Sequence, residues 1–421
     1  MDDLNVVHAA QLVRVRDRGG PRRGEEQGVL DLVADGAVAV RGGLIVAVGP
    51  TEEVLREWDD GAPTLDATGH TVLPGLVECH SHPLFAGERH AEYAQRLGGA
   101  SLAEVAARGG GIWASVLATR AASDDLLLER LEAAYARVVA GGATTLEVKS
   151  GYGLTAASEL RQLELLQRSR TLTPLHLVIS FLGAHVVPAD SDSERYTQDV
   201  LAMLPEVLEQ GIASFHDITC ERGLFSPSQA ARLFTESRRL GISTRCHADA
   251  WETSQGWSTA VAGGASSAEH LTNTPAEEVA ATPDADTVAV LLPQAELIYM
   301  TDRRAPARTF IDQRVPLAVA TDYCSSIHAI SLVTTMGIAA PWYRLTPAEV
   351  VVAATLNAAY ALGLGGDRGS IDVGKRGDLT LLSVGHPEEL FLAVGQQVVS
   401  GVVIGGRVVH SARAATKSPT P

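Results

Sequence analysis

Short apolar segments that end in polar residues alternate with longer amphipathic segments through most of this 421-residue chain. The apolar segments have the length of β-strands, and helices are expected between them, among others at 125–142, 226–241 and 346–364. The eight predicted strands lie at LVECHSH (76–82), TTLEVKSGYG (144–153), LHLVISFLGAH (175–185), IASFHDITCE (212–221), ISTRCHAD (242–249), SSAEHL (266–271), TVAVLLP (287–293) and PLAVATDYC (316–324). Eight strand–helix units predict an α/β fold, a parallel (β/α)8 barrel.

The two ends of the chain have a different pattern. Val- and Ala-rich stretches near the N-terminus and Gly-punctuated hairpin patterns after residue 366 predict strands without intervening helices. We expect the ends to pair in one small composite β-sandwich domain, made of residues 1–68 and 366–412. The barrel would then span 69–365, and 413–421 would be a flexible tail.

Charge and composition narrow the classes of partner. The formal net charge of -16 argues against nucleic-acid and anionic-membrane partners, because both reward basic surfaces. No apolar run reaches membrane-spanning length, and the N-terminus has no signal-peptide pattern. With no export signal, the 4 cysteines are expected to be reduced thiols. These features together predict a cytoplasmic protein.

Polar residues with catalytic or metal-binding potential are concentrated where the predicted strands end. In a parallel barrel the carboxyl ends of the strands form the functional face. The residues at these positions are His80, His82, Lys149, His185, His247, His270 and Asp322. Chance placement would not favour one end of each strand so strongly, and we therefore expect the active site there.

Three of these histidines and the aspartate form a ligand set for one metal ion. His80 and His82 are two residues apart, so on a strand their side chains share one face. Together with His247 and Asp322 they would hold one divalent metal per chain. We expect zinc, with iron and manganese as alternatives, because the same ligands suit all three ions.

Longer strings in the chain resemble one enzyme superfamily. HSH after the first strand, a histidine after a mid-barrel strand, SAEH, and ATD after a late strand resemble the amidohydrolase superfamily. The strings most similar to imidazolonepropionases, the ring-opening hydrolases of histidine breakdown, are RGGGI (108–112), TRAAS (119–123), VKSGYGL (148–154), LGAHVVP (182–188) and RCHAD (245–249). The resemblance implies a hydrolase for a C–N bond of a small cyclic amide that bears a carboxylate. A homodimer is common for such barrels.

The resemblance also implies roles for matched residues. Arg89 would bind the substrate's propionate through two hydrogen bonds, and Tyr152 and His185 would contact the ring. His270 would steady the developing oxyanion or the attacking water. Asp322 could hold the metal through one oxygen and accept the water's proton through the other.

Lys149 allows two interpretations. In other branches of the superfamily a strand-end lysine is carboxylated and bridges two metals, and the presence of His185 leaves that arrangement open. The alternative is a lysine that balances the charge of nearby carboxylates.

The chain departs from the imidazolonepropionase pattern at three places. The family carries glutamate three residues after the third metal histidine, where this chain has Ala250. The family's metal aspartate is followed by an aromatic residue and Asn-Pro-Gly, whereas this chain reads Tyr-Cys-Ser-Ser, with Cys324 either filling the pocket wall or serving as a nucleophile or extra ligand. A family tyrosine upstream of GGGI is replaced by Leu102.

These departures bear on the substrate. Glu252 or Glu269 is a hypothetical replacement for the missing acid. Because groups that hydrogen-bond the substrate ring in the family are missing here, we favour a related enzyme that acts on a diverged cyclic substrate. A true imidazolonepropionase is the alternative, and a deaminase or a non-catalytic metal-binding descendant fits less well.

Overall fold

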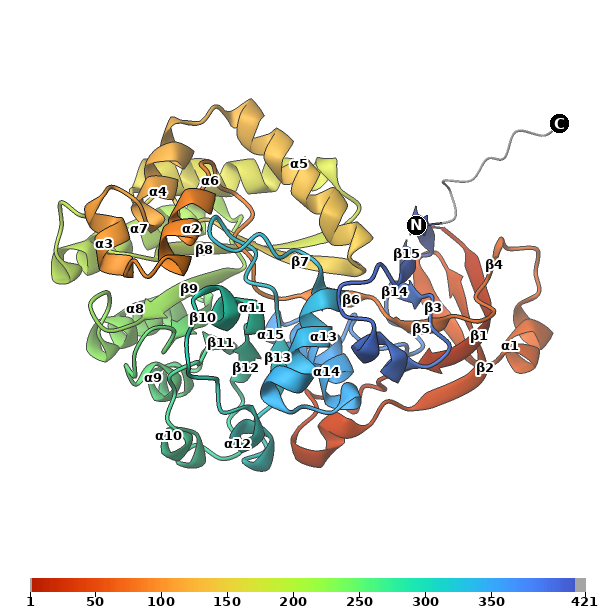
Figure 1. Ribbon diagram of the computed structural model, residues 1–421. Helices are drawn as coiled ribbons and strands as arrows, with labels where there is room; N and C mark the ends of the chain where they lie inside the picture. Colours follow the sequence, from red (N-terminus) through yellow and green to blue (C-terminus); the bar gives the residue numbers. More distant parts are fainter. Residues whose placement is uncertain (1, 413–421) are drawn as a thin grey trace.

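The structure is a computed structural model that describes residues 2–412, so the expected tail at 413–421 lies outside the described residues. The chain forms a helix-wrapped barrel and a β domain beside it (Figure 1). The barrel strands are β6 (Leu76–Glu78), β7 (Ala143–Lys149), β8 (His176–Ala184), β9 (Phe215–Cys220), β10 (Ser243–Ala248), β11 (Ser267–His270), β12 (Val288–Leu291) and β13 (Leu317–Val319). All neighbouring pairs from β6 to β13 are parallel, which confirms the predicted eight-stranded parallel sheet.

Closure of the barrel occurs just beyond the ends of β6 and β13. The amide of His82 donates to the carbonyl oxygen of Tyr323 at 2.7 Å, and the amide of Asp322 donates to that of His80 at 3.2 Å. The two segments that carry candidate metal ligands are thus the segments that close the barrel. Residues more than 200 positions apart in the chain become neighbours for this reason.

Helices cover the outside of the barrel and the rim of its mouth. Those that follow the strands are α5 (Asp124–Ala140), α6 (Ala156–Ser169), α7 (Ser193–Gln210), α8 (Pro227–Arg239), α9 (Gly256–Gly263), α10 (Ala276–Ala280), α11 (Pro293–Ile298), α12 (Ala307–Asp312), α13 (Leu332–Tyr343), α14 (Pro347–Ala353) and α15 (Leu356–Ala361). Before α5, the chain forms α2 (His90–Leu97), α3 (Leu102–Ala107) and α4 (Ile112–Ala121). Short 3-10 helices occur at η1 (Gly24–Gly28), η2 (Arg170–Leu172) and η3 (Pro387–Leu392).

The helix expected at 346–364 is in fact two helices, α14 and α15. Thr355 between them leaves the helical region, with φ -127° and ψ -94°. Its hydroxyl donates to the carbonyl oxygen of Val351 at 2.6 Å, an alternative to the helical backbone pattern that threonine often adopts. The continuous apolar periodicity of this stretch concealed the break.

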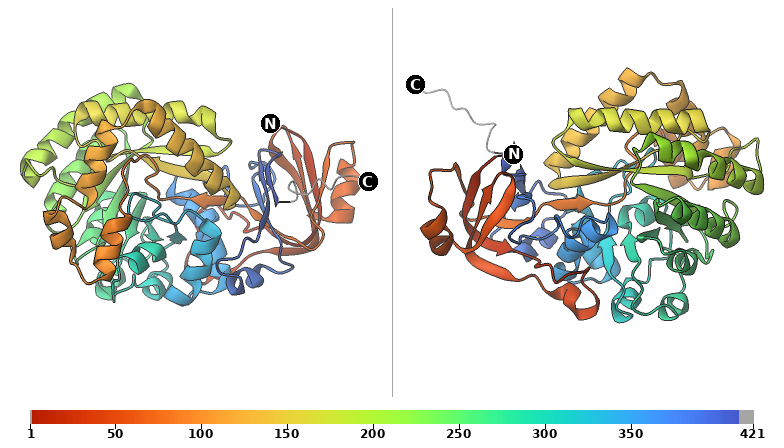
Figure 2. Two further views of the ribbon diagram at one scale, coloured as in Figure 1. Left: turned by 45° about the horizontal axis from the view of Figure 1, so that its top comes forward. Right: turned by 180° about the vertical axis from the view of Figure 1, so that it is seen from behind.

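Both ends of the chain build the second domain, as predicted. Its strands are β1 (Leu4–Val13), β2 (Leu32–Arg41), β3 (Leu44–Pro50), β4 (Thr64–Asp66), β5 (Thr71–Pro74), β14 (Leu379–Leu382), β15 (Val399–Ile404) and β16 (Arg407–Ser411), with α1 (Thr51–Trp58) packed against the sheet. β5 pairs antiparallel with β14 and joins the N-terminal strands to the C-terminal ones. Figure 2 shows the two groups of strands side by side.

None of the helices within residues 2–412 has both the length and the apolar character needed to cross a lipid bilayer.

The buried ring of His216 on β9 should make the stability of the barrel depend on pH. Its ring is buried beside Phe181, its Nδ1 lies 2.7 Å from the Ser237 hydroxyl, and burial lowers its pKa to about 3. In the unfolded chain a histidine has a pKa of about 6.5, so the unfolded state takes up a proton first as pH falls. This group's stabilisation is therefore fully present above about pH 6.5 and declines below it.

Between pH 7 and pH 5 we expect His216 to remove about 2 kcal/mol from the free energy of unfolding. His216→Gln, which does not titrate, should show a correspondingly smaller loss. Urea unfolding at the two pH values measures this difference. Equal losses in the two proteins would contradict the assignment.

Candidate functional site

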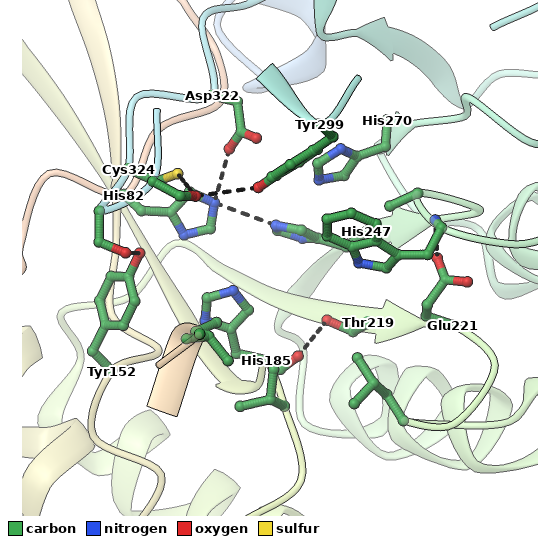
Figure 3. A pocket seen from close by; sticks show the side chains of 18 of the residues that line it. His82, Tyr152, His185, Thr219, Glu221, His247, His270, Tyr299, Asp322 and Cys324 are labelled. Carbon is green, nitrogen blue, oxygen red and sulfur yellow. Dashed lines mark hydrogen bonds and ion pairs between the residues drawn. The ribbon is translucent and has the colours of Figure 1, made fainter. Parts of the chain in front are cut away.

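Three histidine Nε2 atoms and one carboxylate oxygen converge at the mouth of the barrel, and Figure 3 shows three of these four side chains, those of His82, His247 and Asp322. The Nε2 of His82 lies 3.3 Å from the Nε2 of His80 and 3.3 Å from that of His247. The Oδ1 of Asp322 lies 3.5 Å and 3.6 Å from the Nε2 atoms of His80 and His82. All four side chains are buried.

This cluster fits a divalent metal ion better than it fits a hydrogen-bonded network. Two facing imidazole nitrogens can share only one proton, and His82 faces two such nitrogens at once. Tetrahedral bonds of about 2.0–2.1 Å would separate the ligand atoms by roughly 3.3–3.4 Å, close to the observed spacing. Burial also lowers the pKa of His80 and His82 well below the ordinary value, so both are neutral, the form that binds metals.

A buried ion-pair network orients His247 from behind. Its Nδ1 donates to Asp217 Oδ1 at 3.0 Å, so in the neutral ring the Nε2 on the side of the cluster carries no proton. Asp217 Oδ2 in turn accepts from Lys149 Nζ at 2.6 Å, and Lys149 also donates to Glu147 at 2.6 Å. All of these side chains except that of His247 are completely buried.

The geometry at Lys149 supports its interpretation as a charge-balancing residue. Burial alone would lower its pKa, but Asp217 and Glu147 hold the pKa above the ordinary value, so the amine stays charged. A carboxylated lysine would place a further negative charge between these two carboxylates. The interpretation of Lys149 as a bridging ligand is therefore not favoured.

A cavity of about 260 Å³ is lined by His82, His247 and Asp322 of this cluster, and Arg89 and Tyr152 also lie in its wall. Arg89 Nε donates to Glu92 at 2.8 Å, and its Nη1 lies 3.5 Å from the hydroxyl of Ser325. The Tyr152 hydroxyl lies 3.3 Å from the same serine oxygen. Ser325, one of the departures from the family pattern, thus connects the two residues expected to contact substrate.

The VKSGYGL string forms the turn that carries Tyr152. The Glu159 carboxylate accepts hydrogen bonds from the amides of Gly151, Gly153 and Leu154. Gly151 has φ +113°, and a Cβ on Gly153 would lie 2.7 Å from the Glu159 backbone nitrogen, so neither position tolerates a side chain. The glycines therefore bend the loop tightly around a buried carboxylate.

His185 and His270 also line the cavity. His185 stacks on His82 with ring centroids 5.2 Å apart, and its Nδ1 donates to the carbonyl oxygen of Gly151 at 2.9 Å. The His270 ring lies 5.3 Å from that of His247. His270 has φ +72° and Asp322 has φ +54°, a left-handed conformation that is uncommon for residues other than glycine and is often found at functional sites.

Cys324 lies in the cavity wall as a neutral thiol. Its Sγ is 3.3 Å from the hydroxyl of Ser326, and burial raises its pKa to about 12. A nucleophile would need a low pKa, so the structure supports the interpretation of Cys324 as a wall residue.

The hypothesis that Glu252 or Glu269 supplies the missing acid is wrong in its geometry. Asp249 turns the chain with φ +54°, so the extended path of β10 stops there. Glu252 is consequently exposed, with its carboxylate 3.2 Å from Arg222. Glu269 is buried, its carboxylate lies within 4.8 Å of ligand atoms of His80 and Asp217, and it accepts from Arg245 at 2.9 Å. Neither carboxylate lines the cavity.

Glu221, which the sequence analysis did not select, does line the cavity. It directly follows β9, and this strand-end position is the signal that could have identified it. Its carboxylate accepts from the amides of Trp251 and Glu252 and from the hydroxyl of Ser254, at 3.1, 3.0 and 2.9 Å. Burial raises its pKa.

Comparisons with known proteins find matches over most of this chain. Residues 71–409 match the amidohydrolase family, and residues 36–60 match the bacterial imidazolonepropionase-like composite domain. The imidazolonepropionase of Symbiobacterium thermophilum is 41% identical over 97% of both chains, and that of Geobacillus kaustophilus is 38% identical over 97% of this chain and 98% of its own.

Similar solved structures show the same fold. An adenosine deaminase from Xanthomonas campestris with bound zinc has a TM-score of 0.72 at 21% identity, with 99% of this chain and 95% of the other covered. The atrazine chlorohydrolase of Arthrobacter aurescens complexed with zinc has a TM-score of 0.73 at 18% identity, with 97% and 95% covered.

Proposed function

This chain belongs to the amidohydrolase family and is a hydrolase for C–N bonds in cyclic amides, and from this premise we propose that it opens the ring of imidazolonepropionate. The observation that carries the proposal is one small cavity that joins the metal cluster to Arg89. A small ring that bears a carboxylate could contact Arg89 through the carboxylate and the metal-binding residues through the ring, both within this one cavity. The names of the full-length relatives support the same substrate.

In this proposal His80, His82, His247 and Asp322 would hold one divalent ion, with zinc as our assignment. Such an ion lowers the pKa of a bound water from about 15.7 to near 7 and so supplies a nucleophile at neutral pH.

The protein's own groups bind the substrate and move its protons. Arg89 binds the propionate as a planar, charge-assisted donor, and Tyr152 and His185 contact the ring. Asp322 accepts the proton of the attacking water and returns it to the ring nitrogen as the C–N bond breaks. An N–H of neutral His270 donates to the oxygen that gains charge when water adds to the carbonyl carbon.

A second candidate is hydrolysis of another carboxylate-bearing lactam or imidazolone. It is favoured by the lost family glutamate at Ala250 and by the Cys324-Ser325-Ser326 wall, because removal of groups that hydrogen-bond a substrate lowers its rate strongly. The metal cluster and Arg89 serve both candidates equally.

Turnover of imidazolonepropionate by the metal-loaded protein tests the proposal. We expect about one divalent ion per chain by elemental analysis and a kcat of about 1–10³ s⁻¹. Removal of the ion with a chelator should abolish turnover, and its return should restore it.

Ala250→Glu is measured beside the wild type. Efficient wild-type turnover means that this chain works without the family glutamate. A bound ion without wild-type turnover would contradict imidazolonepropionate as the substrate, and the second candidate would then be tested with other cyclic acids. A protein without tightly bound metal and without activity would refute both.

A further inference from the structure

Two aromatic residues that the proposed reaction does not use form one side of the cavity. Trp251 follows β10 and Tyr299 follows α11, and both line the cavity. Their ring centroids are 4.4 Å apart with an interplanar angle of 51°. Trp251 is 42% exposed, which is a large apolar surface to leave in contact with water.

Glu221 holds Trp251 in place. One of its oxygens accepts from the Trp251 amide at 3.1 Å, and the other accepts from Glu252 and from the hydroxyl of Ser254. The Asp249 carboxylate fixes the same loop from its other side, since it accepts from the amide of Ser254 at 2.7 Å. The tryptophan is therefore carried on a loop that is anchored at several points.

Tyr299 is anchored separately, by a helix on the rim of the mouth. Arg96 on α2 donates to the carbonyl oxygen of Tyr299 at 2.8 Å, and its guanidinium lies 5.5 Å from the centre of the tyrosine ring. The Tyr299 hydroxyl lies 3.3 Å from that of Ser326, which lies 3.3 Å from the Cys324 thiol. One edge of the aromatic pair thus offers hydroxyl groups to a ligand.

The position of this pair relative to Ala250 suggests what it binds. Ala250 lines the same cavity and contributes only a methyl group beside the tryptophan. An exposed indole face gains most from a planar conjugated ring, which stacks on it, and little from a flexible acyclic chain. Arg89 remains available for a carboxylate elsewhere in the same cavity.

We propose that Trp251 and Tyr299 form a ring-binding wall, positioned by Glu221 and Arg96, that stacks against the planar heterocycle of the substrate and selects cyclic over acyclic acids. The identity of that heterocycle rests on the proposed function. The wall lies beside Ala250, the position at which the family's glutamate is absent, and supplies contacts to the ring there.

Calorimetric titration of the metal-loaded full chain tests the wall with two stable probes. Imidazole-4-propionate carries a planar ring and a propionate, and glutarate carries carboxylates without a ring. Trp251→Ala should weaken binding of imidazole-4-propionate about 3- to 10-fold and leave glutarate binding unchanged. Trp58→Ala, in the β domain, is the matched control and should alter neither.

Two further variants separate stacking from positioning. Tyr299→Phe removes only the hydroxyl and should weaken the ring-bearing probe less than Trp251→Ala. Glu221→Gln puts an amide NH₂ where one of the loop's donors now finds an oxygen, so it should reproduce part of the Trp251→Ala effect on the ring probe alone.

The outcomes distinguish this proposal from that of the reaction. An equal loss for both probes in Trp251→Ala, no loss for either, or no binding of imidazole-4-propionate by the wild type would overturn the wall. A Trp251-dependent ring preference without turnover of imidazolonepropionate would support the wall and refute the proposed substrate. Turnover of imidazolonepropionate with unchanged probe affinities in Trp251→Ala would support the proposed substrate and refute the wall.

Discussion

Asp322→Asn is expected to lower kcat for ring opening by about 10³-fold while the chain remains folded. The amide has nearly the same shape as the carboxylate and keeps one oxygen that can face His80 and His82. It cannot accept the proton of the attacking water, and it removes the negative charge from the ligand set. The loss should therefore appear in kcat rather than only in KM.

Steady-state kinetics of the metal-loaded variant measure this effect, with elemental analysis to show how much ion is bound. Asp302→Asn, at an exposed position outside the cavity, is the control and should leave kcat within about twofold. If Asp322→Asn with a full complement of metal kept more than a tenth of the wild-type kcat, the proton acceptor would have to be another group. Glu221, as the other carboxylate that lines the cavity, would be the first to test.

The parts of this molecule that follow local rules could be predicted from the sequence. Alternation of strands and helices predicted the parallel barrel. The positions of His80, His247 and Asp322 at the carboxyl ends of predicted strands indicated that they share one face of the barrel, and the structure places them there. Both inferences depend only on residue spacing within a strand or helix. The Gly-punctuated patterns at the two ends of the chain predicted strands by the same local rules, and these strands form one shared sheet.

The parts that depend on loop direction or on distant partners could not be predicted. Glu252 seemed able to reach the site only if β10 continued in an extended path, but the positive φ of Asp249 turns the chain outward. The end of β9 could have marked Glu221 as a candidate, but its hydrogen bond from the amide of Trp251, about 30 residues later, could not be read from the local sequence. The charge state of Lys149 likewise depends on Asp217, 68 positions later.

Lys149→Met is expected to produce the largest loss of stability among these variants. The substitution leaves the carboxylates of Glu147 and Asp217 buried without the cation that both contact at 2.6 Å. Breaking a buried ion pair by removal of one partner costs roughly 3–5 kcal/mol. We expect a decrease of that size in the free energy of unfolding, measured by urea denaturation at pH 7.

Arg161→Met provides the matched control because its ion pair with Asp124 is about one-third exposed. Such surface pairs contribute at most about 1 kcal/mol, so its loss should be much smaller.

The milder variant Asp217→Asn separates the orientation of His247 from the stability of the network. An amide oxygen can still accept from His247 Nδ1, but its charge no longer raises the basicity of the ring, so metal affinity should fall about 10- to 100-fold. Competition with a metal chelator measures this change.

The count of bound ions tests the charge state of Lys149. If the wild type bound two ions per chain only in the presence of bicarbonate, and Lys149→Met bound one, then Lys149 would be a carboxylated bridging ligand. The ion pairs with Glu147 and Asp217 argue against this result, because a charged amine held by two carboxylates has no free electron pair with which to attack CO₂.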